Sequence, residues 1–133
     1  MGGAVLRLLA DTEAVIRFAI DDLPAAARRV MTDQQSEVFV SAASVWELAT
    51  KVRIGKLNLP DVTRTKGIAR WIVEDGFSLL PIRADHAELA GSMVIDHRDP
   101  WDRMILAQAQ IEDFIIISSD PVFARNARDA IWS

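Results

Sequence analysis

The stretch Phe114-Ile115-Ile116-Ile117-Ser118-Ser119-Asp120 gives the clearest indication of fold class in this chain of 133 residues. Its apolar run is continuous instead of alternating, which is typical of a strand buried on both faces of a parallel sheet. Helices are predicted on both sides of it, over residues 100–112, where Pro100 takes the first helical position, and over residues 122–126. A strand flanked by helices predicts an α/β protein with parallel strand pairing.

The rest of the sequence repeats this alternation of strands and helices. Further strands are predicted over residues 6–10, 37–40 and 77–82, with an edge strand at 130–132. Further helices are predicted over residues 13–20, 24–31, 44–53, 65–75 and 84–91, followed by a loop at 92–98. No repeat or linker separates these elements, so residues 1–133 are expected to form one domain.

Composition restricts the chemistry and the compartment. The absence of cysteine excludes disulfides, thiolate zinc sites and a cysteine nucleophile, and it fits a reducing compartment. The start, Met1-Gly2-Gly3-Ala4-Val5, lacks the basic flank of a secretory signal, and no apolar run approaches the roughly 20 residues that cross a membrane. We therefore expect a cytoplasmic protein with no membrane contact.

The charge balance argues mildly against nucleic-acid binding. The formal net charge is −4, whereas phosphate contacts usually come from a surplus of Lys and Arg. Basic residues do gather in the middle third of the chain, where they could follow a nucleic-acid backbone. They are Lys51, Arg53, Lys56, Arg64, Lys66 and Arg70.

Four carboxylates are placed where an α/β sheet could bring them together: Asp11, Glu47, Asp102 and Asp120. Asp11 and Asp120 follow predicted strands, and the carboxyl ends of parallel strands build most sites in such folds. Asp102 lies at a helix start that could face the same edge. Their mutual repulsion would require a cation, and oxygen ligands suit Mg²⁺ or Mn²⁺. An acidic metal site of this kind indicates phosphodiester chemistry.

Each acid also has a purely structural interpretation. Asp11, Asp99 and Asp120 could each cap the helix that follows. Glu47 could form an exposed i, i+4 pair with Lys51. Ser41 or Ser44 would cap the helix that carries Glu47. An apolar stripe predicts the buried face of this helix, and Glu47 lies outside it. The stripe comprises Val45, Leu48, Ala49 and Val52.

The remaining polar and aromatic residues give weaker signals. His86 and His97 are far apart in sequence and are predicted to be surface or loop histidines. The tryptophans are expected in core or interface packing more than in base stacking. They are Trp46, Trp71, Trp101 and Trp132.

Four segments in order resemble the successive motifs of PIN-domain ribonucleases, and most closely those of the VapC-type toxins of toxin–antitoxin modules. They are Leu8-Leu9-Ala10-Asp11-Thr12, Val38 to Lys51 with Ser44-Val45-Trp46-Glu47 at its centre, His97 to Ala109 with Asp99-Pro100-Trp101-Asp102-Arg103, and Ser118-Ser119-Asp120-Pro121-Val122-Phe123-Ala124. The segment from Asp99 to Arg103 and the segment from Ser44 to Glu47 are the most distinctive.

The resemblance implies a PIN-like three-layer sandwich with a mainly parallel central sheet flanked by helices. It further implies an endoribonuclease that depends on Mg²⁺ or Mn²⁺, held inactive by a cognate antitoxin and often forming a homodimer, for which residues around Trp71 or Trp132 could serve. The catalytic acids would be Asp11, Glu47, Asp102 and Asp120, with Asp11 and Asp102 as direct metal ligands and Asp99, Ser118 and Thr12 in support. Glu13 departs from the family pattern, which often has His there, and Ser118 stands where Thr is commoner.

Two other functions remain open at this stage. A phosphatase could use Asp11 as a covalent nucleophile, although Asp11-Thr12-Glu13 lacks the second Asp that such enzymes typically use as acid. A non-catalytic module could use the acids as helix caps and bind a basic peptide. Convergence of the four acids in one cavity would favour the nuclease.

Overall fold

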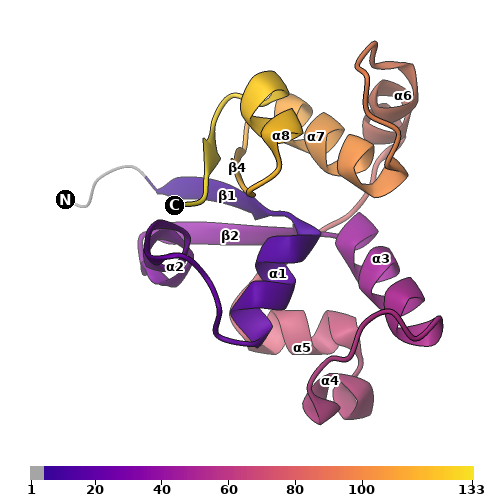
Figure 1. Cartoon of the computed structure of the whole chain (residues 1–133). Coiled ribbons are helices and arrows are strands. Elements are labelled where there is room, and N and C mark those ends of the chain that lie inside the picture. The colour runs from indigo at the N-terminus through magenta and orange to yellow at the C-terminus, as the bar shows by residue number, and fades with distance from the viewer. Residues whose placement is uncertain (1–4) are drawn as a thin grey trace.

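Five parallel strands form the centre of the computed structural model, which describes residues 5–133 (Figure 1). The strands are β1 (Leu6–Ala10), β2 (Ser36–Ser41), β3 (Ser78–Leu80), β4 (Ile115–Ile117) and β5 (Ala130–Ile131). They pair in the order β3-β2-β1-β4-β5, with every pairing parallel. Their carboxyl ends therefore meet at one edge of the sheet, and the edge strand expected near residue 130 is confirmed as β5.

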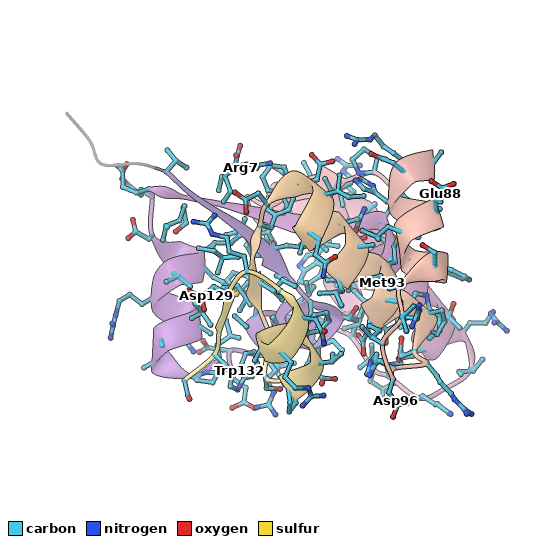
Figure 2. The ribbon with its side chains drawn as sticks, turned by 90° about the horizontal axis from the view of Figure 1, so that it is seen from above. Arg7, Glu88, Met93, Asp96, Asp129 and Trp132 are labelled. Atoms are coloured by element: carbon cyan, nitrogen blue, oxygen red, sulfur yellow. The ribbon has the colours of Figure 1, made fainter. Side chains whose placement is uncertain are left out.

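Helices cover both faces of the sheet. Side chains of β1 alternate between two cores, with Leu8 and Ala10 in one and Leu9 in the other. The first core is closed by α1 (Thr12–Ala19), α2 (Ala25–Thr32), α3 (Ala42–Arg53) and α5 (Ile68–Glu74), and the second by α7 (Pro100–Glu112) and α8 (Pro121–Asn126). This arrangement confirms the three-layer sandwich (Figure 1), and Figure 2 shows the molecule from above with its side chains.

Two helices lie further from the sheet. Helix α6 (Ala84–Ser92) packs on α7, and α4 (Asp61–Lys66) precedes α5. The single helix expected over residues 65–75 is wrong, because Gly67 has φ +87° and separates α4 from α5. That conformation is open to glycine and strained for other residues, so the chain bends there. No helix in residues 5–133 has the length and apolar character needed to cross a bilayer.

The expected buried face of α3 is wrong in part. Leu48 is buried, but Ala49 is exposed, and Glu47 is buried although it lies outside the apolar stripe. Ala43, Ser44 and Glu47 instead share the buried side with Leu48. The reason is tertiary, because the first half of α3 faces a polar cavity and not only the apolar core.

Other surface expectations also change. His86 is not a surface histidine; it is buried on α6, where Nδ1 accepts from the Arg83 N–H and Nε2 lies 2.9 Å from Oε2 of Glu112. Trp71 itself is buried in the core. The expectation about the start of the chain concerns mainly residues 1–4, which lie outside the described residues. The side chain of Arg64, expected in the basic cluster, also lies outside the described part of the structure.

Candidate metal centre

A polar cavity of about 320 Å³ opens at the edge where the strands end. All four predicted acids line it, together with two of the predicted supporting residues. The lining comprises Asp11, Thr12, Glu13, Ile16, Glu47, Lys51, Asp99, Asp102 and Asp120. Residues from four separate segments of the chain therefore converge, as the parallel topology requires.

Asp11 lies at the floor of this site, directly after β1. Its N–H donates to the Ile117 carbonyl at 3.1 Å, which ties the end of β1 to the end of β4. Its Oδ1 accepts from the Ala14 N–H at 2.8 Å, so Asp11 is also the N-cap of α1. Only 5% of Asp11 is exposed. Burial raises its pKa to about 7 against the lowering effect of the Ser118 and Ala14 hydrogen bonds, with a further increase from the negative charges of Glu13 and Asp102.

Asp102 is held by its neighbours at the start of α7. Asp99 caps this helix, with its Oδ1 accepting from the Asp102 N–H at 3.0 Å. Oδ2 of Asp102 lies 2.9 Å from Nε2 of His97. Burial raises the pKa of Asp102, the His97 hydrogen bond lowers it, and the charges of Asp99 and Asp120 raise it further. The carboxylate is therefore both oriented and electrostatically crowded.

His97 was missed as a site residue by the sequence analysis. It does lie in a loop, as expected, but it is half-buried against Asp102. One potential ligand atom each from His97, Asp102 and Asp120 lies within 4.8 Å of the others. The signal in the sequence was its position two residues before the Asp99 cap, which places it at the same helix start.

Arg103 fixes the loop that carries His97. Its guanidinium donates to the backbone carbonyls of Ala90 at 2.8 Å, Met93 at 2.7 Å and His97 at 2.9 Å. These bonds join the end of α6, the loop and the start of α7. Arg103 therefore orients His97 without itself facing the acids.

Glu47 supplies the test of whether a cation fits. Its side chain is 7% exposed, and Oε2 lies 2.6 Å from Nζ of Lys51, so the predicted i, i+4 pair exists but is not a surface pair. Oε1 is buried, and none of the described side chains or backbone groups is its hydrogen-bond partner. Leaving a carboxylate oxygen buried and unpaired is costly, and a cation in the cavity would satisfy it. The carboxylate oxygens of this cavity suit Mg²⁺ or Mn²⁺.

The supporting residues act through hydrogen bonds. The Thr12 hydroxyl donates to that of Ser44 at 2.9 Å, joining the starts of α1 and α3. The Ser118 hydroxyl accepts from the Asp120 N–H at 3.0 Å, and Asp120 caps α8. Ser118 therefore links Asp11 with Asp120.

Glu13 adds charge at the mouth of the cavity. Its side chain is 47% exposed, contacts Arg17 at 3.2 Å and accepts from the Ser119 hydroxyl at 3.1 Å. These partners and the solvent weaken its field, so Glu13 does not close the cavity to a ligand.

Comparisons with known proteins agree with this architecture. A family model described as the PIN domain matches residues 8–129. The chain is similar in fold to VapBC2 from Rickettsia felis bound to a promoter DNA fragment, with a TM-score of 0.63 and 13% identity over 96% of this chain and 100% of the other. It is also similar to a toxin–antitoxin complex from Klebsiella pneumoniae, with a TM-score of 0.63 and 17% identity over 93% and 95% of the two chains.

A third solved structure with a similar fold is FitAcB from Neisseria gonorrhoeae. Its TM-score is 0.56, with 18% identity over 95% of this chain and 96% of the other. At these identities the likeness shows the fold alone. No curated protein sequence matches the chain significantly.

Proposed function

Because the chain belongs to the PIN domain family, we propose that it is an endoribonuclease dependent on Mg²⁺ or Mn²⁺ and acts in the cytoplasm as the toxin of a toxin–antitoxin pair. Nuclease activity is typical of the family. The observation that carries the proposal is the presence of Asp11, Glu47, Asp102 and Asp120 in one cavity. Phosphodiester hydrolysis is the chemistry that best uses such a cavity.

Helix capping alone does not account for these acids. The structural interpretation is confirmed for three acids, because each caps a helix. They are Asp11, Asp99 and Asp120. Glu47 caps no helix, since it lies in the middle of α3, and it is buried beside other acids. Burying repelling carboxylates destabilises a fold unless a ligand compensates, which supports a binding role.

The chain's residues would divide the work by position. Asp11 and Asp102 are our candidates for direct metal ligands, with Glu47 and Asp120 completing the acidic wall. A bound divalent cation would supply Lewis acidity and neutralise charge at the phosphate. Lys51, whose Nζ contacts Glu47, is placed to approach a phosphate oxygen at the mouth. We expect hydrolytic cleavage, because Lewis acidity from a bound divalent cation would allow attack by water without a side-chain nucleophile.

A cognate antitoxin is the proposed partner. The structures with similar folds from Rickettsia felis and Klebsiella pneumoniae are those of toxin–antitoxin complexes. An antitoxin segment carrying an Arg would match the charge of the acidic cavity and block it. We also expect a homodimer, which sedimentation of the purified chain would reveal.

The test is cleavage of structured and single-stranded RNA with Mg²⁺ or Mn²⁺. Asp11→Asn and Asp102→Asn should each reduce the rate roughly 100-fold or more, the scale of losing one preorganised electrostatic group. Glu88→Gln, an exposed acid on α6 outside the cavity, is the matched control and should cut normally. Undiminished cleavage by both cavity variants would remove the proposed mechanism, and a phosphorylated Asp11 would support the phosphatase instead.

A further inference from the structure

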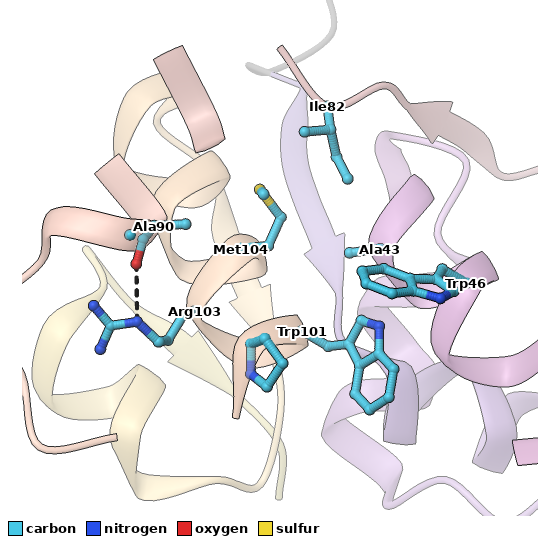
Figure 3. Close-up of a pocket in the computed structure, with 9 residues that line it drawn as sticks. Ala43, Trp46, Ile82, Ala90, Trp101, Arg103 and Met104 are labelled. Carbon is cyan, nitrogen blue, oxygen red and sulfur yellow. Dashed lines mark hydrogen bonds between the residues drawn. The ribbon is translucent and has the colours of Figure 1, made fainter. Parts of the chain in front are cut away.

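A second, apolar cavity of about 230 Å³ lies between α3, α6 and α7 (Figure 3). Trp46 and Trp101 stand at one side of it, and Ile82, Met104 and Ala43 contribute further apolar walls. The one charged residue in its lining, Arg103, directs its guanidinium to backbone carbonyls. The cavity therefore suits a neutral, mainly apolar group.

Trp46 is the unusual residue of this cavity. It is 61% exposed, although a large aromatic side chain gains most from burial. Its ring packs edge-to-face with Trp101, with centroids 5.5 Å apart and an interplanar angle of 77°. Figure 3 shows the indole nitrogen of Trp101 on the side that faces Trp46, and this nitrogen has no hydrogen-bond partner in the described residues. An N–H directed at the ring would orient Trp46 while leaving much of its surface open.

The apolar and acidic cavities share the same two helices. Trp46 directly precedes Glu47 on α3, and Trp101 directly precedes Asp102 on α7. Consecutive helical residues point about 100° apart. Each helix therefore presents a tryptophan to one cavity and a carboxylate to the other, so a ligand that spans the shared wall would meet both.

We infer that the apolar cavity binds one unpaired nucleobase of the RNA whose phosphate lies in the acidic cavity, with the base stacked on Trp46. The inference rests on the proposed nuclease function and adds the form of its substrate. The volume is below that of typical drug-sized pockets, which matches a single base more closely than a peptide helix. A base that is paired in a duplex cannot stack on the Trp46 ring, so the substrate must be single-stranded or looped at this nucleotide.

The experiment uses a set of single-stranded RNAs that each carry one abasic nucleotide, placed at successive positions on both sides of the cleaved bond. Cleavage with Mn²⁺ and metal-free binding by fluorescence anisotropy are measured for the full-length chain. Stacking on an aromatic side chain contributes about 1–3 kcal/mol per base, so one abasic position should weaken binding or kcat/KM by roughly 5- to 150-fold. Trp46→Ala should abolish that penalty, and Trp46→Phe should retain most of it. Val73→Ala, an exposed apolar truncation on α5, should behave as wild type.

The outcomes separate the inference from the proposed function. Cleavage in which every abasic position is tolerated, or in which Trp46→Ala keeps the same penalty, overturns the base site and leaves the nuclease intact. Base-dependent binding through Trp46 without any cleavage supports the base site and removes the proposed nuclease. A change of oligomeric state in Trp46→Ala, with no loss of base dependence, would show that this surface joins two copies of the chain and would overturn the inference.

Discussion

Replacing Asp11 with Asn should stabilise the metal-free protein, and the gain should grow with pH. The pKa of Asp11 is about 7 in the fold and 3.8 as the ordinary value. The folded state therefore holds the proton more tightly than the unfolded state, so stability falls as pH rises from 3.8 and levels off above about 7. Asn cannot ionise, and it can still accept from the Ala14 N–H as an N-cap.

The magnitude follows from the two pKa values. At about 1.36 kcal/mol per pKa unit, the full difference corresponds to roughly 4 kcal/mol. At pH 5 the wild type has already lost about 1.6 kcal/mol of stability through this group. The difference in free energy of unfolding between Asp11→Asn and wild type should therefore widen by roughly 2 to 3 kcal/mol between about pH 5 and pH 8. Urea denaturation in the presence of EDTA, followed by circular dichroism, measures this difference directly.

Two controls identify the cause. Glu13→Gln removes a charge from the mouth of the same cavity, but its exposed side chain should change the free energy of unfolding little at either pH. Saturating Mn²⁺ should stabilise wild type more than Asp11→Asn, by about 2.7 kcal/mol at 100 times the dissociation constant, and so reduce the gap. A gap independent of pH, or wild type more stable than the variant at pH 8 without metal, would refute the reasoning.

Five further substitutions, at four positions, test the supporting structure. Arg103→Met leaves three partly buried carbonyls without this donor and should destabilise the fold by roughly 2–4 kcal/mol in urea titrations, with weaker Mn²⁺ binding. Unchanged stability would contradict the proposed role of Arg103. His97→Gln should lower Mn²⁺ affinity about tenfold by calorimetry while leaving unfolding within ~1 kcal/mol of wild type. Gly67→Ala meets no atom within 4 Å but is strained at φ +87°, so it should cost roughly 1–3 kcal/mol; a neutral effect would refute the backbone argument. Asp120→Asn should keep the α8 cap and Asp120→Ala should lose about 1 kcal/mol, with cation binding weakened in both.

The sequence allowed most of the fold to be predicted because its signals are local. The continuous apolar run at residues 115–117 and the Asp99-Pro100 helix start both fix structure within a few residues. The buried state of His86 could not be predicted in this way, since its partner Glu112 lies 26 residues away. The burial of Glu47 could not be predicted for the same reason. An apolar stripe gives no information about a polar cavity that other segments of the chain help to form.

Capping and metal binding, which the sequence presents as alternatives, are compatible in the structure. Asp99 and Asp120 each use Oδ1 to accept a backbone N–H of the helix that follows. Each cap orients the carboxylate and leaves a second oxygen that the helix does not use. One carboxylate oxygen of Asp120 lies within 4.8 Å of potential ligand atoms of His97 and Asp102. A helix start that follows a strand of a parallel sheet therefore delivers an oriented oxygen to the edge where the other strands end. Capping acids at such positions are thus a reason to look for a site, and the buried Glu47 is what distinguishes this cavity from a set of independent caps.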